Sequence, residues 1–230
     1  GGTSATQSGV IVKDPGNANR YYVFYINNAG SQSYYATIDM TLNGGLGDVV
    51  TKNTGIQAVS GEKIAAWPHA NGTDIWLVLV NQNNIFARLL TAGGIGAAVT
   101  TNVPSPGRRY GQMKFSPDGA KLAITCYPTS FASYQVQLVD FNNSTGQFSN
   151  LQSWALDEPY GVEFSPNGDY LYITDMGWAS APGHIMQYDI LNNTTGAAIG
   201  ASGVSILSAN HLFSSSPYSN NGKSTIQRTL

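Results

Sequence analysis

Charged residues are scarce in this 230-residue chain, where Asp, Glu, Lys and Arg together make up 10% of the sequence. An average soluble domain has roughly 25%. The 11 basic and 13 acidic residues give a net charge of −2, and no basic run is present, so we expect no nucleic-acid partner. Solubility must come from Asn, Ser, Thr, Gly and Gln, a balance that suits an extracellular β-protein.

Cysteine, long apolar runs and helical periodicity are also scarce. The single cysteine, Cys126, cannot form a disulfide within the chain, and its place in a predicted strand favours a small buried side chain over a reactive thiol. No apolar stretch approaches the ~20 residues that a membrane-spanning helix needs, so we expect no membrane insertion. Without a useful helical period, the sequence favours an all-β fold.

The feature that stands out is a turn that occurs twice. Residues 115–119 read Phe-Ser-Pro-Asp-Gly and residues 164–168 read Phe-Ser-Pro-Asn-Gly, a displacement of 49 residues. Proline presets φ at the first turn position, glycine supplies positive φ, and Asp or Asn can bond the local backbone. An apolar run follows each copy, at 121–126 and at 170–175. A unit repeating in phase at this length indicates an array of similar modules.

Four such units can be read along the chain. A glycine marks the turn after the third strand of each unit, at Gly45, Gly94, Gly146 and Gly196, with spacings of 49, 52 and 50 residues. Short β-rich runs alternate with turn residues inside each unit, which predicts an antiparallel four-stranded meander. A meander recurring every ~50 residues is typical of β-propeller blades, whereas a sandwich predicts no turn repeating in register.

The expected strands of the first unit are 9–13, 21–26, 34–39 and 48–51, and those of the second are 63–67, 74–80, 84–89 and 97–101. Four blades are predicted within residues 1–202, at approximately 4–54, 55–102, 103–153 and 154–202, followed by a partial or degenerate fifth blade at 203–230. Propellers usually close with ~4–8 blades. We therefore expect the chain to be a fragment of a larger propeller, stable beside further blades or a partner that protects its open edges.

Several stretches together resemble a known group of proteins. Residues 5–24, 38–49 and 160–168, with Glu62-Lys63 and 69–72, resemble the opening blades of large surface proteins from Bacteroidota. Those proteins pair a WD-repeat-like propeller with a gliding-motility-associated or type IX secretion sorting domain. The resemblance covers residues 4–200 in order. It implies a secreted or cell-surface bacterial propeller, with the remaining blades of a parent protein as neighbours, and no assigned chemistry.

Binding residues are expected on one loop face. In a propeller, the loops joining strand two to three and strand four to the next blade share a face that usually holds the site. Exposed aromatic rings there stack on sugars or anchor protein partners, and Arg adds bidentate donors. Alternatively, these aromatic rings fill gaps between blades. The candidates are Trp178, Trp154, Tyr160, Tyr127, Arg108, Arg109 and Tyr110, with Trp178 the strongest.

Sequence motifs for catalysis are missing. No Gly-x-Ser-x-Gly elbow, His-x-x-x-His or Cys-x-x-Cys occurs, and the sequence assigns no partner to His69, His184 or His211. We therefore expect a non-catalytic module without a cofactor that binds a glycan or protein partner. A structural spacer or a domain that docks the secretion machinery is a further alternative.

An enzyme of another class remains as an alternative. Residues 160–168 with 171–175 also resemble gluconolactonase-type propellers, which hold a divalent cation at the channel mouth. In that family an Asn supplies a metal ligand where this chain has Tyr160. Asp175 is the residue that could still hold calcium, which needs ~6–8 oxygen ligands. This alternative predicts a calcium-dependent lactonase-type hydrolase.

Overall fold

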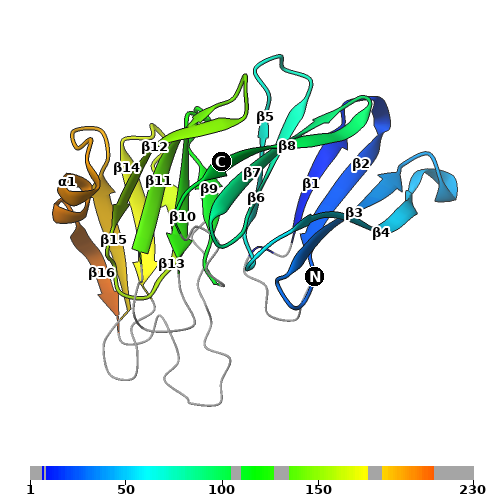
Figure 1. The fold of residues 1–230 in the computed structure, drawn as a ribbon. Helices are drawn as coiled ribbons and strands as arrows, with labels where there is room; N and C mark the ends of the chain where they lie inside the picture. Colours follow the sequence, from blue (N-terminus) through cyan, green and yellow to red (C-terminus); the bar gives the residue numbers. More distant parts are fainter. Residues whose placement is uncertain (1–6, 8, 105–109, 127–134, 176–182, 210–230) are drawn as a thin grey trace. The chain divides into compact units, whose positions relative to one another are not determined.

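The computed structural model describes residue 7 and residues 9–104, 110–126, 135–175 and 183–209. These residues form four antiparallel sheets of four strands each, and neighbouring strands follow one another along the chain (Figure 1). By packing, the chain divides into two compact units, Gly1–Gly107 with Phe141–Phe148 and Arg108–Asp140 with Ser149–Leu230. The fold is therefore a series of meanders, as the repeated units predict.

Each sheet takes its strands from one stretch of sequence. Sheet 1 contains β1 (Gly9–Asp14), β2 (Asn17–Ile26), β3 (Gln32–Asp39) and β4 (Asp48–Ala58), with a 3-10 turn η1 (Asn43–Gly45). Sheet 2 contains β5 (Ile64–Pro68), β6 (Ile75–Val80), β7 (Asn84–Thr91) and β8 (Gly94–Asn102). Sheet 3 contains β9 (Met113–Phe115), β10 (Lys121–Cys126), β11 (Gln135–Asn142) and β12 (Gln147–Trp154). Sheet 4 contains β13 (Pro159–Phe164), β14 (Tyr170–Asp175), β15 (Gly183–Asp189) and β16 (Val204–Ala209), with the short helix α1 (Gly196–Ala201).

The repeated Ser-Pro turn joins the first and second strands of sheets 3 and 4. Ser116 donates its backbone N–H to the carbonyl of Lys121, and Ser165 does the same to Tyr170, both at 2.9 Å. Gly119 and Gly168 have φ of 71° and 79°, a left-handed conformation that glycine adopts without steric cost. The same local chemistry therefore builds the same hairpin twice.

The end of the fourth unit differs from the prediction. Residues 204–209, assigned to a partial fifth blade, form β16, the fourth strand of sheet 4. Gly196 begins α1 instead of closing a tight turn, because Thr195 caps this helix by accepting a hydrogen bond from the backbone N–H of Ala198. Because α1 lies between β15 and the fourth strand, that strand begins at Val204, after the predicted end of the blade at residue 202. Residues 210–230 lie outside the described residues.

Two apolar cores lie between sheets, one in each unit. In the first unit Phe24 and Ile26 of sheet 1 pack with Leu77 and Leu79 of sheet 2, and all four are 0% exposed. In the second unit Ala123, Val136 and Leu138 of sheet 3 pack with the strands of sheet 4. Burial of these faces is the main favourable contribution to folding. Among the described residues, neither helical segment has the length and apolar character needed to span a membrane.

Gly146, in the turn between β11 and β12, packs closely against the side chain of Trp76. A Cβ on Gly146, whose φ is 75°, would lie 2.6 Å from the indole ring of Trp76. Gly146→Ala should lower the free energy of unfolding by about 2–5 kcal/mol, because left-handed alanine costs about 1–2 kcal/mol and overpacking about 1–3 kcal/mol. Denaturant titration measures this loss. Gly72→Ala is the control, since φ there is 74° and nothing lies within 4 Å of the added Cβ. Equal losses from both substitutions would contradict the Trp76 contact.

Candidate functional site

The structure describes some of the predicted ligand-contact residues and leaves others outside the described residues. Tyr110 is half-buried, so its predicted role as a contact is neither supported nor contradicted. The other candidates on long loops, Trp178, Tyr127, Arg108 and Arg109, lie outside the described residues. Their predicted roles as ligand contacts stay predictions.

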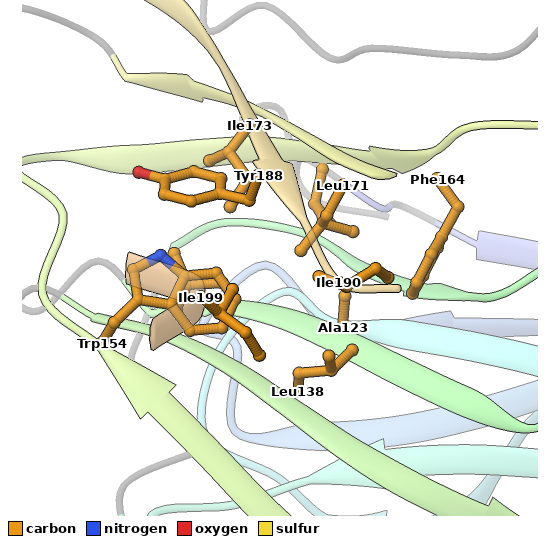
Figure 2. Close-up of a cluster of buried hydrophobic side chains, with 11 residues drawn as sticks. Ala123, Leu138, Trp154, Phe164, Leu171, Ile173, Tyr188, Ile190 and Ile199 are labelled. Carbon is orange, nitrogen blue, oxygen red and sulfur yellow. The ribbon is translucent and has the colours of Figure 1, made fainter. Parts of the chain in front are cut away.

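Trp154 and Tyr160 are core residues, so the prediction that they are exposed ligand contacts is wrong. Trp154 is 7% exposed and Tyr160 is 1% exposed. Trp154, at the end of β12, packs against Tyr188 with ring centroids 5.2 Å apart, and Ile199 of α1 belongs to the same cluster (Figure 2). Large rings contribute most to stability where they exclude water. Both residues thus fit the alternative in which aromatic rings fill gaps between sheets.

Asp175 occupies a position that is apolar in sheets 2 and 3. Sheets 2, 3 and 4 share a turn between their first and second strands, in which a backbone N–H bonds a carbonyl five residues later. The accepting carbonyls belong to Asp74, Lys121 and Tyr170. Counting five residues on from each of these gives Leu79 in sheet 2, Cys126 in sheet 3 and Asp175 in sheet 4. Leu79 and Cys126 are 0% exposed. Sheet 4 therefore places a carboxylate where the repeat otherwise places core.

His184 faces Asp175 across the hairpin of β14 and β15. Its backbone N–H donates to Asp175 Oδ1 at 2.7 Å, and its Nδ1 lies 2.9 Å from Oδ2. Burial raises the pKa of the Asp175 carboxyl above its ordinary value, and the hydrogen bonds from His184 partly oppose that shift. The side chain of His184 is 31% exposed and that of Asp175 is 11% exposed. The pair thus reaches from the core to the surface.

Packing alone does not explain this pair. In sheets 2 and 3 the equivalent cross-strand pairs are Leu79 with Phe86 and Cys126 with Gln135. A buried carboxylate carries a desolvation penalty that a neutral or apolar residue avoids. Ionisable groups perturbed by burial and held by a specific partner mark candidate functional sites. Asp175 and His184 are therefore the candidate site of this chain.

The loop before β13 borders the pair. Pro159 is the register partner of Asp175, and the preceding Glu158 is buried with a left-handed φ of 45°. Such a backbone conformation costs free energy in a non-glycine residue and is frequent at functional sites. The exposed Asp157 also raises the pKa of Asp175 through its negative charge, although less than burial does. Residues 157–159 thus form an acidic border to the site.

The side chains of two buried threonines hold the start of β13, which follows residues 157–159, through hydrogen bonds to its backbone. Thr125 donates its hydroxyl hydrogen to the carbonyl of Tyr160 at 2.6 Å and accepts from the backbone N–H of Gln112 at 2.8 Å. Thr174, at the equivalent position of sheet 4, accepts from the backbone N–H of Gly161 at 2.8 Å. Buried hydrogen bonds of this kind are costly to leave unmade. They hold the start of β13 rigid beside Asp175.

The calcium alternative lacks its ligand set in the part of the chain that the structure describes. No group of three or more His, Cys, Asp or Glu side chains gathers there as a metal site would require. Calcium binds ~6–8 oxygens, whereas Asp175 pairs with an imidazole. The described residues around Asp175 therefore do not fit calcium.

The arrangement has a definite hydrogen-bonding chemistry. When Asp175 accepts the Nδ1–H of neutral His184, the other ring nitrogen, Nε2, is an acceptor for a hydroxyl group; when the ring is protonated, Nε2 is a donor to an anion.

Sequence reasoning missed this pair because its members are nine residues apart on different strands. The signal that could have found it is the 49-residue repeat, which aligns Asp175 with Cys126.

Comparison with known proteins gives the fold. No protein-family model and no curated protein matches the sequence. Solved structures provisionally named as 6-phosphogluconolactonases, from Bacteroides fragilis and Bacteroides uniformis, each match with a TM-score of 0.55 at 15% identity, over 86% and 91% of this chain and 54% and 58% of their own. A protein from Lactobacillus plantarum matches with a TM-score of 0.51 at 12% identity, over 83% of this chain and 54% of its own. The chain thus spans about half the length of these structures.

Structural similarity at 12–15% sequence identity establishes the fold of this chain but not its activity. The four four-stranded antiparallel sheets match partial β-propellers, so the prediction of an all-β propeller is confirmed. The resemblance to Bacteroidota gliding-motility and secretion-sorting proteins is not tested by these matches and stays a prediction.

Titration of Asp175 should be visible in the stability of the protein. Because burial raises its pKa in the native state, the native state binds this proton more tightly than the unfolded chain does. Between the unfolded and the raised native pKa the native state holds more protons, so the free energy of unfolding falls as pH rises. The difference between wild type and Asp175→Asn should therefore fall across this acidic window and level off above it. Urea titrations at several pH values measure it, and a constant difference would contradict the raised pKa.

Proposed function

We propose that this chain is the ligand-binding part of a secreted or cell-surface bacterial β-propeller, non-catalytic, which recognises a glycan at the loop end of sheet 4. The observation that carries the proposal is the Asp175–His184 pair, a carboxylate hydrogen-bonded to an imidazole where sheets 2 and 3 pair Leu79 with Phe86 and Cys126 with Gln135. Asp175 orients the imidazole of His184, whose partly exposed ring faces the ligand.

A glycan fits the chemistry of this end of the sheet. Sugar hydroxyls donate and accept hydrogen bonds, which suits both the acceptor Nε2 of neutral His184 and the carboxylate of the exposed Asp157. Trp178, the sequence candidate for stacking on a sugar ring, falls between Asp175 and His184 in the sequence and lies outside the described residues. A protein partner is the alternative ligand class, since aromatic residues also anchor protein interfaces.

Binding to a glycan array should depend on the pair. His184→Ala should weaken binding of the best glycan about twofold to tenfold, corresponding to roughly 0.5–1.5 kcal/mol for a hydrogen bond between neutral groups. Asp175→Asn should weaken it as well, because the carboxylate no longer holds the ring tautomer. Gln135→Ala, at the equivalent position of sheet 3, is the matched control and should bind like wild type.

The outcomes separate the candidate roles. Equal binding by His184→Ala and wild type would remove the pair from the site. Absence of any glycan ligand for the wild-type protein would leave the protein-partner, spacer or secretion-docking roles.

A hydrolase is the second candidate, and the same pair favours it. A histidine held by a carboxylate can act as a general base: Nε2 of His184 would take a proton from water while the water oxygen attacks the carbonyl carbon of a lactone. The ring C–O bond then breaks, and the proton passes to the leaving oxygen to yield a hydroxy acid. The fold match to provisionally named 6-phosphogluconolactonases motivates this substrate class. Lactone turnover by wild type, lost in His184→Ala, tests the candidate without reference to glycan binding.

A further inference from the structure

Asparagine followed by glycine is a chemically reactive pair, and the structure describes three such pairs: Asn43-Gly44, Asn71-Gly72 and Asn167-Gly168. A further pair, Asn221-Gly222, lies outside the described residues. Asparagine is a thermolabile residue, because the backbone nitrogen of the next residue can attack its side-chain carbonyl carbon. A glycine there favours the attack, since it has no Cβ to hinder the approach. All three described asparagines are exposed, so exposure does not distinguish them and their hydrogen bonds must.

Hydrogen bonds hold the pair in the turn between β5 and β6. The backbone N–H of Gly72, which would be the attacking group, donates to the carbonyl of His69 at 2.9 Å. The side-chain amide of Asn71 donates to Asp74 Oδ2 at 2.8 Å and accepts from the backbone N–H of Asp74 at 3.0 Å. Attack therefore requires that bonds to both reacting groups are broken first.

The pair in the turn between β13 and β14 is held in the same way. The backbone N–H of Gly168 donates to the carbonyl of Ser165 at 2.9 Å. The side-chain amide of Asn167 accepts from the hydroxyl of Ser165 at 2.7 Å and donates to the carboxylate of Asp169. Both reacting groups are again engaged.

The pair in η1, between β3 and β4, lacks these restraints. The backbone hydrogen bonds of this turn are donated by the N–H groups of Gly45, Leu46 and Gly47. Within the part of the chain that the structure describes, the N–H of Gly44 donates no hydrogen bond and the side chain of Asn43 takes part in none. A Cβ added to Gly44 would also meet nothing within 4 Å. Neither hydrogen bonds nor packing therefore oppose the approach of the Gly44 nitrogen to the Asn43 side chain.

We propose that Asn43 is a site of spontaneous deamidation, with the chain itself and water as the reactants. The Gly44 nitrogen attacks Cγ of Asn43, the amide C–N bond of the side chain breaks, and the amide nitrogen leaves as ammonia with the proton from Gly44. Water then adds to a carbonyl carbon of the resulting succinimide ring, and a ring C–N bond breaks to give an aspartyl or isoaspartyl residue. The product carries an added carboxylate in a hairpin whose end already pairs Asp39 with Asp48.

Peptide mapping by mass spectrometry, after incubation of the folded protein in mildly alkaline buffer, tests the proposal. Asn43 should deamidate about tenfold faster than Asn71 or Asn167, a factor equal to about 1.4 kcal/mol, which two hydrogen bonds broken before attack supply. In urea, where the fold is lost, the three should react at similar rates. Equal rates in the folded protein overturn the proposal. The same preference for Asn43 in urea overturns it too, because the difference then belongs to local sequence.

Two reciprocal variants test the role of the hydrogen bonds. Asp74→Ala removes the carboxylate that holds the Asn71 amide and should speed deamidation of Asn71 about twofold to tenfold, the factor for one hydrogen bond. Asp169→Ala should do the same for Asn167. In each variant the untouched pair is the matched control and should keep its wild-type rate. Acceleration of the untouched pair, or none of the freed one, overturns the assignment of the difference to hydrogen bonds.

Discussion

The burial of one sheet face against the next is the constraint on which this structure depends. A single four-stranded meander has two faces and cannot bury both by itself, so its stability comes from a neighbouring sheet. Phe24 and Ile26 of sheet 1 meet Leu77 and Leu79 of sheet 2 in one unit, and sheet 4 meets Ala123 and Val136 of sheet 3 in the other. Turns and hydrogen bonds shape each sheet, but the apolar faces decide what each sheet needs beside it.

The same constraint explains why Asp175 is informative. A repeated sheet has a fixed set of positions that point into a sheet-to-sheet core, and apolar residues fill these positions in sheets 2 and 3. A carboxylate at such a position has a desolvation cost that only a partner such as His184 offsets. Where a repeat departs from its own pattern at such a cost, the departure is evidence for a local role beyond packing.

Much of the fold could be predicted from local sequence. The Ser-Pro turns at 115–119 and 164–168 predict hairpins because proline and glycine restrict the backbone directly, and the alternating runs predict the strands. The boundary of the fourth unit could not be predicted in this way. Thr195 caps a short helix after β15, and six residues of weak helical character are decided by packing of Ile199 on the core more than by propensity.

The sequence by itself therefore determined the repeated four-stranded unit, its length and its turns, since these follow from backbone preferences that act over a few residues. The tertiary structure decided which aromatic rings are buried and which polar groups meet. Trp154 and Tyr160 read as binding residues from their loop positions, yet both lie in the core. Asp175 and His184 had no visible relation in the sequence, and only the register of β14 and β15 brings them together. Burial and cross-strand contact depend on the packing of whole sheets, which local preferences do not encode.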